Sequence, residues 1–343
     1  MRRILIAAGV VTLAIAPLVA QSSATPHFHV ERRIALPGDG FWDYVAVDAT
    51  WRRLFVTHGT HVQVVDLDSD SLVGDIPNTP GVHGVAFAPE AGRGFTSNGR
   101  DSSVTVFDLK SLAVISRIKL DARFPDAIAY EPVSGRVFTF NGGSANTTAI
   151  DAQTGAVEGT LALGGSPEAG VADGTGRMYV NLEDSSAVVT FDARTLNALY
   201  RWSLSPGEEP TGLALDRVHR RLFAGCANKK LIVLDASNGK RVAELPIGDS
   251  VDGVAFDAER QLVFSSNGDG TLTVIHEDTP DKYTVVENAV TERGGRTLAL
   301  DAASGRVYIP TAKFGPPPAP TADRPHPRPS IVPGTFHVMV IRQ

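Results

Sequence analysis

Apolar residues in this chain gather in short runs, and polar, turn-forming residues separate one run from the next. The runs are rich in Val, Ile, Thr and aromatic residues, as in RLFVTH at 53–58 and RVFTFN at 136–141. This length and composition are typical of β-strands. After residue 24, no segment spaces its apolar residues three and four positions apart, as an amphipathic helix requires. The pattern therefore predicts an all-β protein.

One phrase, which starts with a polar or charged residue and continues with small and apolar residues, recurs along the chain. Its copies are DYVAVD (43–48), HGVAFA (83–88), DAIAYE (126–131), EAGVAD (168–173), TGLALD (211–216), DGVAFD (252–257) and RTLALD (296–301). The first positions of successive copies lie 40 to 44 residues apart. A fixed period of this length indicates seven repeated units, each of which buries its surface against its neighbours.

Each unit contains four strand-like segments. The phrase is the first segment, and a run after a turn such as SGR (134–136) is the second. The third is a run with Asp near its end, such as TVFDL (105–109). The fourth resembles AVISRIKL (113–120). Four short strands in each of seven units predict a seven-bladed β-propeller with four-stranded antiparallel blades.

The two ends of the repeat array predict how the ring closes. The last unit has a third strand within TFHVMVIRQ (335–343) but no fourth, and FHVERRIAL (28–36) matches the fourth-strand pattern. We therefore expect the N-terminal strand to pair with the C-terminal blade, which leaves no open sheet edge. Residues 25–343 then form a single propeller domain.

The second strands also resemble a known motif. They read LFVTH (54–58), GFTSN (94–98), VFTFN (137–141), MYVNL (178–182), LFAGC (222–226), VFSSN (263–267) and VYIPT (307–311). These are similar to degenerate copies of YVTN, and on them the chain resembles the YncE-like YVTN-repeat β-propeller proteins. The resemblance implies the propeller fold. It implies little about function, because this architecture includes binding proteins, lactonases, lyases and redox enzymes.

The first position of the phrase, here named the entry column, varies while its surroundings stay nearly constant. The entry column consists of Asp43, His83, Asp126, Glu168, Thr211, Asp252 and Arg296. The innermost strand of a propeller blade lines the central channel, so we expect these side chains to surround one channel mouth. Crowded carboxylates favour a bound cation or a basic partner. We predict that all of them except Thr211 bind ligand; the alternative is a ring of solvated, mutually compensated residues.

The ends of the second strands form a companion column, and four of its members are predicted to contribute to the same site: His58, Asn98, Asn141 and Asn267. Carboxylates with Asn amides suit Ca²⁺ or Mg²⁺, whereas His58, His83 and Cys226 would suit a softer transition metal. The residue types do not select between these divalent ions. Asn followed by Gly also has a purely structural use in hairpin turns.

One insertion interrupts the period. FGPPPAPTADRPHPRPSIVPG (314–334) lies between the second and third strands of the last unit. Its proline content predicts a stiff, extended loop rather than additional sheet. Its position predicts that it emerges on the channel-mouth face and lies across the opening; the alternative is a solvated loop without a role in binding.

The first 24 residues differ from the rest of the chain. Arg2 and Arg3 precede the apolar run ILIAAGVVTLAIAPLVA and the short stretch QSSA, which predicts a secretory signal peptide cleaved after Ala24. Pro17 and the polar residues after Ala20 shorten the run, so we expect no membrane span after cleavage. The expected location is periplasmic or secreted.

Charge and motifs narrow the class of function. The formal net charge of −6 disfavours nucleic acid as a partner, and Cys226 has no second cysteine to pair with. The sequence contains no P-loop, Rossmann glycine fingerprint, HExxH, CxxCH or GxSxG motif. We predict a monomer that binds a small polar ligand or a metal ion in the central funnel. Two alternatives stay open: a metal-dependent lactonase or lyase at the same funnel, and a platform that binds another protein.

Overall fold

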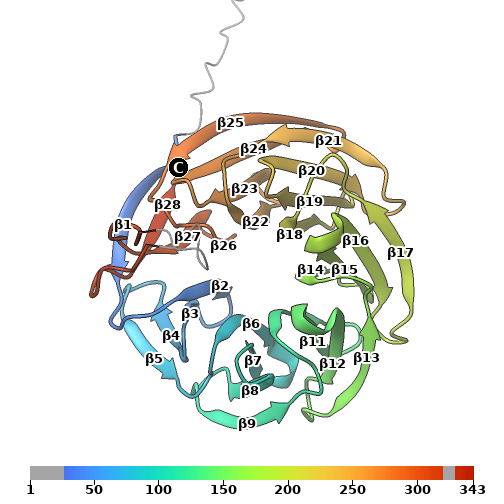
Figure 1. The fold of residues 1–343 in the computed structure, drawn as a ribbon, viewed down its shortest axis with the longest axis horizontal. Coiled ribbons are helices and arrows are strands. Elements are labelled where there is room, and N and C mark those ends of the chain that lie inside the picture. The colour runs from blue at the N-terminus through green and yellow to red at the C-terminus, as the bar shows by residue number, and fades with distance from the viewer. Residues whose placement is uncertain (1–26, 320–328) are drawn as a thin grey trace, which may run out of the picture.

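A computed structural model describes residues 27–319 and 329–343 of the chain. Within these ranges the backbone forms seven four-stranded antiparallel sheets, arranged as blades around a central channel (Figure 1). The prediction of an all-β, seven-bladed propeller is confirmed. The predicted signal peptide (1–24) and the middle of the insertion (320–328) lie outside the described residues. No helix within the described ranges has the length and apolar character needed to cross a membrane.

In every blade the strands follow one another from the channel outwards. Blades one to three contain β2 (Trp42–Asp48), β3 (Arg53–His58), β4 (His61–Asp66), β5 (Leu72–Ile76); β6 (Val82–Ala88), β7 (Arg93–Asn98), β8 (Ser103–Asp108), β9 (Val114–Lys119); β10 (Pro125–Glu131), β11 (Arg136–Asn141), β12 (Asn146–Asp151) and β13 (Val157–Ala162). Blades four and five contain β14 (Pro167–Ala172), β15 (Arg177–Leu182), β16 (Ala187–Asp192), β17 (Ala198–Ser203); β18 (Pro210–Asp216), β19 (Arg221–Cys226), β20 (Lys230–Asp235) and β21 (Arg241–Pro246). Blades six and seven contain β22 (Val251–Asp257), β23 (Leu262–Asn267), β24 (Thr271–Thr279), β25 (Lys282–Val290); β26 (Ala299–Asp301), β27 (Arg306–Thr311), β28 (His337–Arg342) and β1 (His29–Ala35). Single 3-10 turns lie at Pro89–Ala91, Gly142–Ser144 and Glu183–Ser185.

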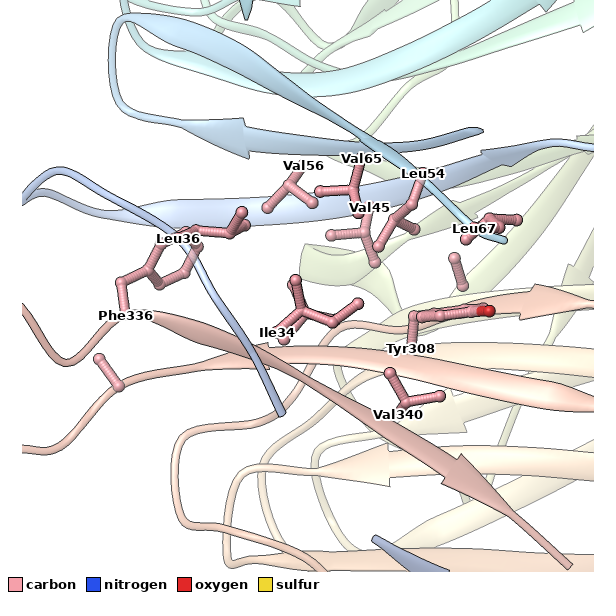
Figure 2. Packing of buried hydrophobic residues seen from close by; sticks show 13 residues of the cluster. Ile34, Leu36, Val45, Leu54, Val56, Val65, Leu67, Tyr308, Phe336 and Val340 are labelled. Carbon is pink, nitrogen blue, oxygen red and sulfur yellow. The ribbon is translucent and has the colours of Figure 1, made fainter. Parts of the chain in front are cut away.

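Blade seven closes the ring with a strand from each end of the array. β1 pairs antiparallel with β28, so the sheet order is β1-β28-β27-β26, as predicted. Ile34 of β1 is buried between this sheet and blade one, where it shares a cluster with Val45 and Val340 (Figure 2). The N-terminal strand therefore contributes both backbone pairing and apolar packing to the closure.

The core of the protein lies between neighbouring blades. Second and third strands are almost entirely buried, as β3 and β4 illustrate, whereas an outer strand such as β9 is mostly exposed. Apolar side chains of one blade pack directly on those of the next. This close packing makes a rigid frame, which fixes the positions at which the first strands begin around the channel.

Candidate functional site

The entry column lies where the pairing of the first strand is interrupted. In blade one, Trp42 pairs with His58 and regular pairing resumes only at Val45, so Asp43 and Tyr44 are skipped. The same irregularity skips the entry residue in blades two to six. A residue outside the regular ladder can be directed away from the sheet. The repeated fold thus presents one variable side chain per blade at the same end of the channel.

His83 joins two carboxylates from the neighbouring blades. Its Nδ1 lies 2.6 Å from Oδ2 of Asp43 and 3.3 Å from Oδ1 of Asp126. The single hydrogen on Nδ1 can be donated to only one of them, and the closer is Asp43. Oδ1 of Asp126 is buried and has no hydrogen-bond partner within the described residues. One nitrogen and two oxygens therefore face one another within 4.8 Å, close enough to hold one metal ion.

Arg296 is the basic residue of the same column. Its Nη1 lies 3.0 Å from Oδ2 of Asp252, and its Nη2 lies 3.9 Å from Oδ1 of Asp43. Asp43 thus lies between His83 on one side and Arg296 on the other. Thr211 behaves differently, because its hydroxyl donates to the backbone carbonyl of Val251 at 2.7 Å.

Tyr44 contributes to the site although sequence analysis did not single it out. Its hydroxyl, from blade one, donates to Oε1 of Glu168 in blade four at 3.3 Å, so the side chain crosses the channel. The sequence did contain a signal for Tyr44, because the residue after the entry column is small in every other blade. These small residues are Gly84, Ala127, Ala169, Gly212, Gly253 and Thr297. One bulky aromatic residue among six small ones marks the place where a side chain fills the channel.

Three carboxyl groups in the channel mouth have raised pKa values. Burial, with repulsion from Asp126 and Asp252, raises the pKa of Glu168 to about 9. Burial likewise raises the pKa of Asp252 to about 7, although Arg296 opposes the shift. The pKa of Asp126 is also raised well above its ordinary value by burial and by Asp43. At neutral pH the site therefore retains protons, which a bound cation would displace.

A small cavity continues inward from these groups. Its volume is about 190 Å³, and its walls include Tyr44 and Asp252 together with small and apolar residues of the first strands. This volume suits a small ligand rather than a large one.

The structure does not bring the Asn residues of the companion column to the channel mouth. Their side-chain amides bridge the hairpin that follows them: Asn98 donates to Ser103 and Thr105, Asn141 to Asn146 and Thr148, and Asn267 to Thr271 and Thr273. All three Asn side chains are buried within their blades. Their repeated role is to fix the hairpin between the second and third strands, so we leave them out of the site.

His58 and Cys226 are also buried within blades. The His58 ring packs on Phe336, with 4.4 Å between ring centroids, and burial lowers its pKa. Neither ring nitrogen has a hydrogen-bond partner in the described part of the chain. Burial raises the pKa of Cys226 to about 12, so its thiol stays protonated at neutral pH. A metal site built from His58, His83 and Cys226 therefore has no support from this arrangement.

The two described ends of the Pro-rich insertion lie beside the start of β2. The Phe314 ring is 6.1 Å from the ring of Trp42, which precedes Asp43 in the chain. Phe314 also forms a bridge with Ile331, and the backbone N–H of Gly334 donates to Asp39. These contacts hold the base of the insertion on the side of blade one where the entry column lies.

Comparisons with known proteins agree on the architecture. A family model described as outer membrane protein assembly factor BamB matches residues 100–277, which is 178 of the 343 residues. No curated protein sequence matches the chain significantly.

Solved structures resemble most or all of the chain at low sequence identity. A chain in the crystal structure of a mitotic checkpoint complex matches with a TM-score of 0.74 and 15% identity, over 100% of this chain and 99% of the other. The WD40 repeats of RRP9 match with a TM-score of 0.77 and 9% identity, over 93% and 99%. Hydrazine synthase from Kuenenia stuttgartiensis matches with a TM-score of 0.70 and 15% identity, over 81% and 94%. At these identities the likeness concerns the fold alone.

Proposed function

The chain belongs to the family whose model is described as outer membrane protein assembly factor BamB, and on this premise we propose that it is a binding propeller. Its channel mouth takes a divalent metal ion and, with it, a small polar ligand. The proposed role is binding or scaffolding.

One observation carries this proposal. Oδ1 of Asp126 is buried without a hydrogen-bond partner, although it lies 3.3 Å from the Nδ1 of His83, which already serves Asp43. A buried carboxylate oxygen without a partner is costly, and a cation between the three residues would remove that cost.

The donor set favours a transition metal ion over Ca²⁺. Ca²⁺ takes about six to eight oxygen ligands, whereas one imidazole nitrogen with two carboxylate oxygens suits Zn²⁺ or Mn²⁺. The Asn amides that would have supported a Ca²⁺ site are used within their blades. Arg296 and the proton-bearing Glu168 stand beside the three donors and supply polar contacts to the rest of the ligand.

The test is metal analysis of protein purified without chelator, followed by zinc and manganese titrations of His83→Ala and Asp126→Asn. Both variants should lose the ion while their free energy of unfolding changes by no more than about 1 kcal/mol, because neither removes a large apolar volume. Asp75→Asn is a matched control, because Asp75 also faces a His, His61 at 3.8 Å, but is half exposed. Full metal content in His83→Ala and Asp126→Asn would contradict the proposal.

A second candidate is a metal-dependent lactonase or lyase at the same place. It is favoured by the raised pKa of Glu168, which bears a proton at neutral pH and is hydrogen-bonded to Tyr44. Such a carboxyl can act as a general acid beside a metal ion that polarises a carbonyl. Under this candidate, Glu168→Gln keeps the metal and loses turnover of a lactone substrate. Absence of turnover by metal-loaded wild-type protein across a lactone panel would contradict it.

The finer features predicted from sequence also belong to the proposal. The second-strand segments support a relationship to YncE-like YVTN-repeat proteins. The N-terminal charge and apolar pattern supports export to the periplasm or beyond. N-terminal sequencing of protein from the exported fraction should start near Thr25. Intact Met1 in protein from the cytoplasmic fraction would contradict export.

A further inference from the structure

A second cluster of metal-type ligands lies at the opposite end of the first strands. Asp216 is the last residue of β18 in blade five, His219 lies in the turn that follows, and Glu277 lies in β24 of blade six. Blades five and six are neighbours in the ring (Figure 1). The cluster therefore joins two blades on the face away from the channel mouth.

Glu277 occupies a position that is apolar in blades one to five. Its backbone N–H donates to the backbone carbonyl of Gln261, which lies in the turn before the second strand. In blades one to five the equivalent residue makes the same hydrogen bond; these residues are Leu67, Leu109, Ala152, Ala193 and Ala236. All five of these residues are buried. A single glutamate has thus replaced a small or apolar residue at a repeated interior position.

The Glu277 carboxylate is buried and unpartnered. The residue is 0% exposed, and neither of its side-chain oxygens has a hydrogen-bond partner in the described ranges. The nearest donors serve other groups: Tyr283 donates to the carbonyl of Pro280, and Arg221 pairs with Asp281 and with backbone carbonyls. Leaving a carboxylate buried in this way is costly in either protonation state, because its polar atoms stay unpaired.

His219 completes the cluster. Its Nδ1 lies 2.7 Å from Oδ2 of Asp216 and 3.2 Å from Oε1 of Glu277. Its one hydrogen can serve a single carboxylate, and the hydrogen bond goes to Asp216. The turn also holds Asp216 in place through the backbone N–H groups of Val218 and His219.

In blades six and seven the residue three positions after the equivalent acid contacts it directly. In blade six, the guanidinium of Arg260 pairs with Asp257. In blade seven, the hydroxyl of Ser304 donates to Asp301. In blade five the corresponding residue is His219, and it faces the buried glutamate of the next blade. The histidine and the glutamate depart from the repeat at one shared place, which indicates a joint role.

We propose that Asp216, His219 and Glu277 form a second metal site, for a divalent transition metal ion such as Zn²⁺, that ties blade five to blade six. The three donor atoms lie within 4.8 Å of one another. Ligand atoms at the usual Zn²⁺ bond lengths of about 2.0–2.1 Å are about 3.3 Å apart in a tetrahedron. The 3.2 Å between His219 and Glu277 matches this separation, whereas the 2.7 Å between His219 and Asp216 must widen when the ion replaces the hydrogen on Nδ1. His219 is partly exposed, so the fourth position opens to water.

The test uses Zn²⁺ as the probe on the full chain, stripped with EDTA and dialysed, in a His83→Ala background that disables the channel mouth. Zinc per protein and the melting temperature with and without zinc are measured for Glu277→Ala and His219→Ala. Glu277→Ala restores the residue that blades three to five carry at this position, so it should fold. His219→Ala, at a partly exposed residue, tests binding independently of the buried position.

We expect the His83→Ala background to retain one zinc equivalent and to melt at a higher temperature with zinc. Both added variants should lose that equivalent and the zinc-induced shift. In EDTA, Glu277→Ala should melt at the same or a higher temperature than its background, because an unpartnered buried carboxylate is gone; a purely structural ion pair predicts the reverse. Unchanged zinc content in both variants, or a lower melting temperature of Glu277→Ala in EDTA, would overturn the proposal. Because the channel mouth is disabled throughout, neither result bears on the function proposed there.

Discussion

Glu168→Gln should change how stability depends on pH. In the folded protein, the pKa of Glu168 is raised from an ordinary 4.5 to about 9 by burial and by repulsion from Asp126 and Asp252. Between these two values the folded state holds a proton that the unfolded state has released. The folded form is therefore favoured at low pH, and this contribution is lost as pH rises towards 9.

The size of the effect follows from the number of protons. One additional proton in the folded state lowers the free energy of unfolding by about 1.4 kcal/mol for each unit of pH, so about 2–3 kcal/mol is lost from pH 6 to pH 8. Glutamine keeps the shape of the side chain and can still accept the Tyr44 hydroxyl, but it does not titrate. The variant should therefore lose about 2–3 kcal/mol less than the wild type over this interval.

Urea unfolding in EDTA at pH 6, 7 and 8 measures the difference without bound metal. Glu259→Gln is the control, because it makes the same chemical change at a carboxyl that is 78% exposed and lies away from the channel mouth. If the free energies of wild type and Glu168→Gln fall in parallel with pH, Glu168 does not carry the extra proton. The cause assigned to its raised pKa would then be wrong.

Three further predictions concern closure of the ring and access to the channel. Ile34→Ala should lower the free energy of unfolding by about 2–5 kcal/mol in urea melts, because Ile34 is buried where β1 packs on blade one. Ile115→Ala, on the exposed β9, should change it by no more than about 0.5 kcal/mol. Equal losses would contradict closure by β1. Tyr44→Ala introduces the residue that blades three and four carry at this position, and it should unblock the channel. Stopped-flow experiments with a chelator should then show faster metal release. An unchanged rate would argue against a blocking role. Replacing 314–334 with an Asn-Gly hairpin should leave the melting temperature within a few degrees while changing metal affinity or exchange rate, and identical binding would mean that the insertion has no part in access.

The fold was predictable from sequence because each blade is specified locally. β-rich runs separated by turns fix the strands, and the period of 40 to 44 residues fixes the number of blades. The segment FHVERRIAL (28–36) also matches the fourth-strand pattern, which predicted the pairing of β1 with β28 that closes the ring. All of these features depend on neighbours in the chain or on a repeat that can be counted.

The entry column was also visible in the sequence, because a position that varies inside a constant phrase is free of packing requirements. What sequence could not supply was the direction and reach of individual side chains. Asn98, Asn141 and Asn267 end their second strands close to the entry column in sequence register, yet the NH₂ groups of their side chains donate to polar groups of their own hairpins.

Contacts between blades were decided by tertiary structure alone. Tyr44 meets Glu168 across 124 positions of sequence, and Asp216 and His219 meet Glu277 from the next blade. Tyr44 and Glu277 each differ from the residues at the same position of other blades, which the sequence displays, but their partners depend on how the blades are arranged around the axis. The sequence thus determined which positions are unusual. The closure of the ring determined which of them lie together, because packing between blades sets these distances and separation along the chain does not.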